Sequence, residues 1–251
     1  MITDPYFYML AVPALLLMGV SKGAFGQGVG TLSTPLMALA VPAPVAAAIT
    51  LPILCLMDLT GIWGYRGQWD RSQMRIIVPG AAIGVAVGGL LFGVLDDHAV
   101  GLLIGILAFV FGLEWWLRRG VERPPSKPHR GRGLFWSALS GFTSCVAHAG
   151  GPPIAVYLLP QRLDRRAYVA TMVLFFTVVN WMKFVPYGIL GLFSFQNVMT
   201  SLALVPVAPI GMGLGIWLHE KIPPIPFYRI CYGFVLISGA KLIYDNAPLV
   251  F

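Results

Sequence analysis

The chain has 251 residues, of which 57% are hydrophobic and only 11% are charged, and its mean hydropathy is +0.79. So few polar side chains cannot cover the surface of a water-soluble domain of this length, which excludes soluble enzymes and nucleic-acid-binding proteins. The long, unbroken apolar runs also exclude a β-barrel, whose strands alternate apolar and polar residues. We therefore expect an all-α polytopic membrane protein that contacts membrane lipid and has no nucleic-acid partner.

Six apolar runs have the length of about 17 to 25 residues that is needed to cross the hydrocarbon core of a bilayer. Glycine and proline within such runs are tolerated in transmembrane helices. The sequence thus predicts six transmembrane helices, in chain order at residues 44–65, 74–95, 100–117, 168–190, 196–218 and 227–244.

Two further apolar regions are interrupted by glycine-rich segments. Residues 6–20 are apolar but short, and a polar, glycine-rich stretch at 21–30 separates them from a second short run at 31–41. Residues 134–147 likewise lead into a His-Ala-Gly-Gly-Pro-Pro stretch at 148–153 and a second short run. Arms of about 10 to 15 residues measure roughly 15 to 22 Å as helices, which is too short to cross comfortably. We predict two re-entrant helical hairpins with glycine-rich tips inside the membrane.

Lys and Arg in short loops set the orientation of a membrane protein. The opposite loops at 42–44, 96–99 and 189–196 contain none, so the basic loops are expected on the cytoplasmic side of the membrane. Both termini then lie on the non-cytoplasmic side, and the net charge of +7 follows from this topology. Fourteen of the 17 basic residues fall in four loops: Arg66, Arg71 and Arg75; Arg118, Arg119, Arg123, Lys127, Arg130 and Arg132; Arg162, Arg165 and Arg166; Lys221 and Arg229.

The same topology predicts two inverted repeats, because each half has three spans and one hairpin and hence an odd number of crossings. We expect a first membrane repeat at 1–117, a basic cytoplasmic connector at 118–132 and a second membrane repeat at 133–251. Matching residues, at an offset that grows from 121 to 128, support a duplication: Gln27 and Gly30 with His148 and Gly151; Asp58 and Tyr65 with Asn180 and Tyr187; Pro79, Gly84 and Gly88 with Pro206, Gly211 and Gly215; Gly105 with Gly233.

The two tips are expected to line a cavity, because a helix broken inside a membrane leaves backbone groups that must face protein or water. Where each second arm begins, N–H groups and the positive end of a helix dipole suit an anion, and glycine allows close approach. The alternative is that the glycines only let helices pack closely, the favoured interpretation for Gly84, Gly88, Gly211 and Gly215. The predicted anion-binding residues of the tips are Gly26, Gln27, Gly28, Gly30, Thr31, Ser144, His148, Gly150 and Gly151, with Ser33, Thr34 and Thr143 as further hydroxyl donors unless they bond to their own backbone.

Ionisable residues inside the apolar runs are the other functional candidates. Lys22 and Lys183 are predicted contacts to an anion, with Asn180 one helical turn from Lys183 on the same face; either lysine can instead extend to the interface. Asp58 is the only carboxylate well inside a span, and it is a candidate proton carrier or the partner of a lysine. His148 is the second candidate for proton coupling, with a buried neutral histidine as the alternative.

The cysteines and histidines offer little further chemistry. Cys55, Cys145 and Cys231 lie within apolar runs and are odd in number, so no disulfide framework is expected. Cys145 and His148 leave open an intramembrane enzyme or a thiol-relay carrier. The four histidines are scattered without ligand spacing, so we expect no metal and no cofactor.

The chain resembles the TauE/SafE family of bacterial membrane transporters, which are associated with sulfite export and the transport of organosulfur anions. The resemblance covers essentially the whole chain, although His148-Ala149 stand where the family usually has glycine, and Val156 where it usually has proline. These differences bear on the substrate more than on the fold. The residues that carry the resemblance are 23–36, a weaker second copy at 141–151, and Asn180 with Lys183.

The resemblance implies a transporter and not an enzyme. It implies a secondary transporter that moves a small anionic substrate, sulfite or an organosulfonate, by alternating access. The sequence leaves open which of these anions is carried, the direction of transport, the coupling ion and whether the chain forms a homo-oligomer.

Overall fold

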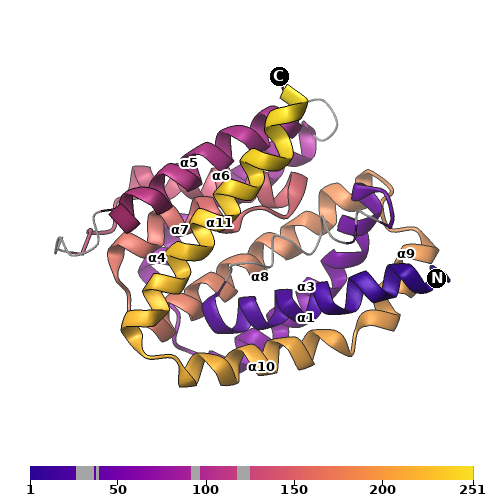
Figure 1. Ribbon diagram of the computed structural model, residues 1–251, viewed down its shortest axis with the longest axis horizontal. Helices are drawn as coiled ribbons and strands as arrows, with labels where there is room; N and C mark the ends of the chain where they lie inside the picture. Colours follow the sequence, from indigo (N-terminus) through magenta and orange to yellow (C-terminus); the bar gives the residue numbers. More distant parts are fainter. Residues whose placement is uncertain (27–36, 38–39, 92–96, 118–124, 251) are drawn as a thin grey trace. The chain divides into compact units, whose positions relative to one another are not determined.

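The computed structural model describes residues 1–26, 37, 40–91, 97–117 and 125–250, and within these residues the chain is helical and has no strand (Figure 1). The prediction of an all-α protein is confirmed. In chain order the helices are α1 (Pro5–Phe25), α3 (Ala43–Gly64), α4 (Arg71–Leu90), α5 (Asp97–Leu117), α6 (Arg130–Ala147), α7 (Gly151–Leu158), the 3₁₀ turn η2 (Leu159–Gln161), α8 (Arg165–Ile189), α9 (Phe195–Leu204), α10 (Val207–Lys221) and α11 (Pro224–Val250).

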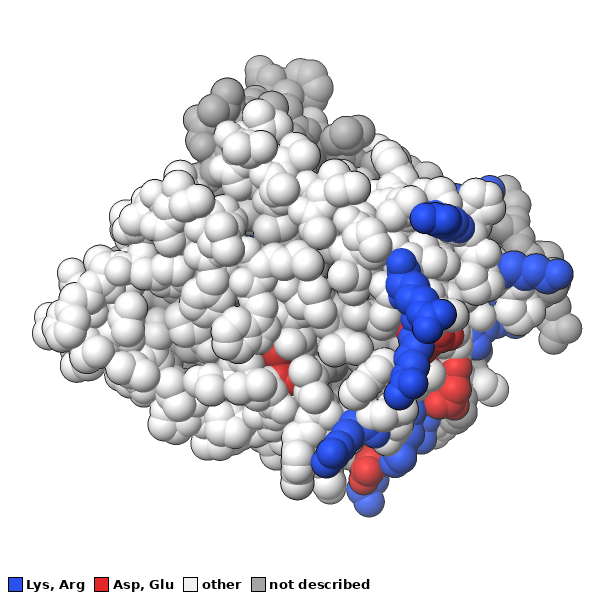
Figure 2. All heavy atoms as spheres, turned by 180° about the vertical axis from the view of Figure 1, so that it is seen from behind, with Lys and Arg blue, Asp and Glu red and all other residues white. Residues whose placement is uncertain are grey.

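Helix length, hydropathy and surface character confirm a polytopic membrane protein. Among the described residues, α1, Val45–Gly64 of α3, α4 and α8 are long and apolar enough to cross a membrane, and the bent pair of α9 and α10 adds a fifth if it forms one span. Large apolar side chains, including those of Trp63, Leu90 and Ile189, are at least 79% exposed. Such exposure is unfavourable in water and favourable in lipid. Figure 2 shows broad surfaces without Lys, Arg, Asp or Glu.

One predicted span is two helices. The run at 196–218 divides into α9 and α10, which are bent by 43° relative to each other. Pro206 is the N-cap of α10. Proline has no N–H to donate, and its ring clashes with the preceding turn, which breaks a continuous helix at this point.

The first arm of the first predicted hairpin is longer than expected. Asp4 caps α1 by accepting a hydrogen bond from the Tyr6 N–H, and the helix continues for 21 residues through Lys22 to Phe25. At 1.5 Å per residue this is roughly 32 Å, which is long enough to cross the hydrocarbon core. The prediction of a short arm over residues 6–20 was therefore wrong, because neither Lys22 nor its flanking small residues end the helix. Residues 27–30 of the predicted tip and most of the second arm, residues 31–36, 38 and 39, lie outside the described residues.

The described helices form two compact units, each of which combines helices from both predicted repeats. Unit 1 comprises Met1–Asp70 and Val169–Ile222, and unit 2 comprises Arg71–Tyr168 and Pro223–Phe251. The predicted repeat boundaries at 117 and 133 remain a prediction about the duplication, and they do not coincide with the limits of these units.

In unit 1, α1 lies alongside α10 (Figure 1). Glycines bring the two backbones close together, since a Cβ atom on Gly19 would lie 2.9 Å from the Gly211 Cα and one on Gly23 would lie 2.9 Å from the Gly215 Cα. Helix α3 contacts α9 and α10, and Ser201 of α9 donates a hydrogen bond to the Ile49 carbonyl of α3 (2.8 Å).

In unit 2, α4 packs against α6, and α5 packs against α11. A Cβ atom on Gly84 would overlap the Ala138 carbonyl oxygen, and one on Gly88 would lie 3.0 Å from the Cys145 Cβ. The glycines at 84, 88, 211 and 215 thus serve helix packing, as their spacing predicted.

We predict that Gly215→Ala destabilises the protein by about 1–3 kcal/mol, because the added Cβ would lie 2.5 Å from the Val20 carbonyl oxygen and would force α1 and α10 apart. The matched control is Gly213→Ala on the same helix, where a Cβ atom would meet nothing within 4 Å. Thermal unfolding of the two purified variants in detergent measures the difference. Equal midpoints for both variants would contradict this account of the packing.

Candidate functional site

Three Lys, Arg, Asp or Glu side chains are buried among those that the structure describes. They are Lys22 on α1, Asp58 on α3 and Lys183 on α8, with exposed fractions of 3%, 0% and 0%. All three belong to unit 1. A charge in an apolar interior is costly unless an opposite charge or hydrogen bonds compensate it, so such residues mark functional sites in membrane proteins.

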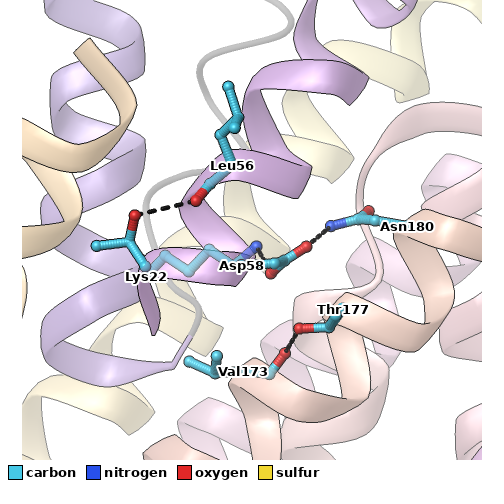
Figure 3. A network of polar contacts seen from close by, with 7 residues as sticks. Lys22, Leu56, Asp58, Val173, Thr177 and Asn180 are labelled. Atoms are coloured by element: carbon cyan, nitrogen blue, oxygen red, sulfur yellow. Dashed lines mark hydrogen bonds and ion pairs between the residues drawn. The ribbon is translucent and has the colours of Figure 1, made fainter. Parts of the chain in front are cut away.

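The Asp58 carboxylate is bound through both of its oxygens (Figure 3). Lys22 Nζ forms an ion pair with Oδ1, and Asn180 Nδ2 donates a hydrogen bond of 2.7 Å to Oδ2. Lys183, one turn beyond Asn180 on α8, adds a further electrostatic attraction to the carboxylate. These four residues are called the buried charge cluster below.

The buried charge cluster contains two lysines and one carboxylate, so its formal charge is positive. The neutral Thr177 hydroxyl donates to the Val173 carbonyl of its own helix (Figure 3), and the Thr60 hydroxyl donates to the Leu56 carbonyl. Electrostatic interactions are strong where water is excluded. A buried site with an excess of positive charge favours the binding of an anion.

The end of α1 is held by two residues that the sequence did not single out for this role. Tyr65 donates its hydroxyl hydrogen to the Gly23 carbonyl (2.5 Å), and His219 Nδ1 lies 2.8 Å from the Ala24 carbonyl oxygen. Their positions are 42 and 195 residues away from these carbonyls, so no local pattern could reveal the contacts.

The second predicted break lies where the sequence placed it. Helix α6 ends at Ala147, His148 adopts a left-handed conformation with φ 52°, and α7 begins at Gly151. Ser140 donates a hydrogen bond to the Gly150 carbonyl (2.6 Å). A Cβ atom on Gly150 would lie 2.7 Å from the Ser140 carbonyl oxygen, so glycine is needed here for close packing.

The side chains at this second break are buried within unit 2. Ser144 and His148 are 3% and 6% exposed. Thr143, a predicted hydroxyl donor, bonds to backbone carbonyls, those of Leu139, Ser140 and Ala149. Cys145 is fully buried and packs close to Gly88 of α4.

The structure brings together only part of the predicted site. Lys22, Asp58, Asn180 and Lys183 form one cluster in unit 1, and Gly26 ends α1 in the same unit, with a φ of 77°. Ser144, His148, Gly150 and Gly151 lie in unit 2. Within the described residues no group of His, Cys, Asp and Glu could hold a metal ion. The remaining predicted residues lie outside the described part of the chain: Gln27, Gly28, Gly30, Thr31, Ser33 and Thr34.

The ends of α1 and α6 have similar backbone caps. The C-cap N–H of Gly26 bonds to the Lys22 carbonyl, and the C-cap N–H of His148 bonds to the Ser144 carbonyl. If the two halves are duplicated as predicted, these caps would pair Gly26 with His148 at an offset of 122, one residue from the predicted pairing of Gln27 with His148. Asp58 and Asn180, which the sequence analysis pairs at the same offset, are hydrogen-bonded to each other.

Comparison with protein families gives a match over nearly the whole chain. The family described as "Sulfite exporter TauE/SafE" matches residues 11–242. A comparison with curated proteins found no match, and neither did a comparison with solved structures.

We predict that Lys22→Met destabilises the protein by about 3–5 kcal/mol, because it leaves the Asp58 carboxylate buried without its ion-pair partner. The double variant Lys22→Met/Asp58→Asn removes both charges and is expected to recover at least half of the loss. Thermal unfolding in detergent measures both.

The matched control is Lys241→Met, which breaks the Lys241–Asp245 ion pair of α11, where the side chains are 36% and 35% exposed. Such an exposed pair contributes about 0–1 kcal/mol, so this variant should unfold close to the wild-type temperature. A double variant as unstable as the sum of its single variants would contradict the assignment of a coupled pair.

Proposed function

Since the chain belongs to the sulfite exporter TauE/SafE family of membrane transporters, we propose that it is a secondary transporter of small sulfur-containing anions, sulfite or an organosulfonate. We propose further that it acts in the bacterial inner membrane by alternating access. The main support for an anionic substrate is the buried charge cluster, which has an excess of positive charge because it contains two lysines and only one carboxylate.

The chemistry of the cluster suits such a substrate. Sulfite and sulfonates present a negative charge and several oxygens that accept hydrogen bonds, and lysine ammonium groups donate up to three. In this proposal Lys183 and Asn180 bind the anion from α8, and Lys22 binds it from α1. Asp58 holds Lys22 in place while the site is empty.

The proposal includes the two predicted breaks. At the first, Gly26 would allow close approach, although its own N–H bonds to the Lys22 carbonyl, and Gln27, Gly28, Gly30 and Thr31 would offer backbone and hydroxyl donors. Ser144, His148, Gly150 and Gly151 would do so at the second. Glycine near a helix start allows such close approach to an anion.

Two inverted repeats, as the sequence predicts, would support alternating access. The first arms of the two predicted hairpins, α1 and α6, each pack against a helix through corresponding glycines: α1 against Gly215 of α10, and α6 against Gly88 of α4. Equivalent packing in the two halves is expected if both descend from one duplicated unit. The basic loops would face the cytoplasm and both termini the opposite side.

Asp58 is the residue best suited to couple transport to protons. When it is ionised it attracts Lys22, and when it is protonated that attraction is lost and Lys22 can bind a substrate anion instead. His148 remains the second candidate for this role.

We predict that liposomes containing the purified protein take up sulfite or methanesulfonate faster than protein-free liposomes. Lys183→Met should lower the initial flux by about tenfold to a hundredfold, because it removes a charge-assisted contact. Lys241→Met is the control and should transport like the wild type. No flux of any sulfur oxyanion or sulfonate with correctly folded wild-type protein would refute the proposed substrate.

We further predict that Asp58→Asn separates transport from the proton gradient. Methanesulfonate is the suitable substrate, since it stays ionised while sulfite itself exchanges protons. Wild-type uptake should respond to an imposed pH gradient, whereas Asp58→Asn should exchange labelled substrate across the membrane without that response. Asp58→Glu keeps the carboxyl group and should keep the response, and a normal response in Asp58→Asn would assign coupling to another residue.

A further inference from the structure

The C-terminal end of α1 has its backbone carbonyls bound by specific donors. The last turn of a helix leaves carbonyl groups without partners inside the helix. Here the Lys22 carbonyl accepts from the Gly26 N–H (2.9 Å), the Gly23 carbonyl from the Tyr65 hydroxyl (2.5 Å), and the Ala24 carbonyl from His219 (2.8 Å). One donor belongs to α1 itself, and two reach it from elsewhere in unit 1.

Those two donors come from different helices. Tyr65 is the C-cap residue of α3, and His219 lies in the last turn of α10. Both are buried, with exposed fractions of 3% and 1%, and their rings are in edge-to-face contact at 5.5 Å between centroids. Because a carbonyl oxygen can only accept a hydrogen bond, Nδ1 of His219 carries the hydrogen. Tyr65 and His219 are called the carbonyl clamp below.

The carbonyl clamp acts on the turn that carries Lys22. Lys22 precedes Gly23 and Ala24 directly, and its side chain reaches the Asp58 carboxylate on α3. Gly23 also packs against the Gly215 backbone of α10, so the turn is held by the same two helices on which the clamp residues lie. A shift of this turn would move the Lys22 ammonium relative to Asp58.

We propose that Tyr65 and His219 are positioning residues, which fix the end of α1 and thereby the place of the Lys22 ammonium in the buried charge cluster. The effect on transport rests on the proposed function, whereas the effect on the end of α1 does not. Ordinary helix capping would stabilise the fold but would act independently of Lys22. The experiment therefore has two arms.

The first arm measures hydrogen–deuterium exchange of the peptide containing residues 20–26 in the purified, substrate-free protein. Tyr65→Phe and His219→Ala should each increase exchange about tenfold, because each removes a buried hydrogen bond. His219→Asn places an amide donor where Nδ1 stands and should restore slow exchange, whereas His219→Gln places its amide near the Nε2 position and should not. Unchanged exchange in Tyr65→Phe and in His219→Gln would overturn the proposal.

The matched control for this arm is Tyr8→Phe. The Tyr8 hydroxyl also donates to a backbone carbonyl, that of Ile2 (2.8 Å), but it does so at the opposite end of α1. Its loss should leave exchange at residues 20–26 unchanged. An increase equal to that of Tyr65→Phe would overturn the proposal, because the effect would then be a general loss of stability.

The second arm measures the sulfite concentration that gives half-maximal flux into liposomes. His219→Ala should raise it about tenfold and His219→Asn much less. In a Lys22→Met background, His219→Ala should cause no further increase, because a positioning residue acts only through the residue that it positions. Additive effects of the two substitutions would overturn the proposal. If the wild type carries no sulfite, the proposed function fails, and the exchange arm still tests the clamp.

Discussion

A lysine and an aspartate that are paired away from water determine how α1, α3 and α8 must meet. Burying the charge of Lys22 or Asp58 alone in an apolar interior would cost free energy. Each charge lowers the cost of burying the other only while the two side chains remain in contact. Asn180 binds the second carboxylate oxygen, so the carboxylate is satisfied on both sides. The end of α1 has to lie beside α3, and α8 has to present the face that carries Asn180. The charges thus fix the arrangement of three helices, two from the first half of the chain and one from the second.

Glycines allow the helices to approach closely enough to form these contacts. In a lipid environment helices gain little from burying apolar surface, so they associate through close backbone contact and polar groups. Gly19, Gly23, Gly211 and Gly215 let α1 approach α10 closely enough for His219 to reach the Ala24 carbonyl. Glycines of α4 bring that helix close to α6 in the same way, and on the predicted duplication Ser144 of α6 would occupy the position of Lys22. Close glycine packing occurs in both units, whereas the buried Lys and Asp side chains of the described residues all lie in unit 1.

Hydropathy predicted the helices well wherever a single helix spans the apolar run, as in α3, α4 and α8. It located the break after α6 because Gly150, Gly151 and two prolines end one helix and begin another. It failed at the end of α1, because a lysine lowers the hydropathy and so indicates the end of an apolar run. The helix nevertheless continues through Lys22, whose charge is compensated by Asp58. It also missed the bend at Pro206. The roles of Tyr65 and His219 depend on contacts between distant segments, which local sequence patterns do not contain.

In the proposed mechanism, the position of Lys22 would connect anion binding with proton coupling through electrostatics alone. The ammonium lies in the last turn of α1, at the negative end of the helix dipole, and beside a carboxylate. Both features stabilise the cation while the site is empty, and an arriving anion has to compete with Asp58 for it. Protonation of Asp58 removes the competitor and leaves two lysines to attract the substrate. On the proposed mechanism, therefore, a proton and an anion favour each other's binding because they share one lysine, and no separate proton relay is required.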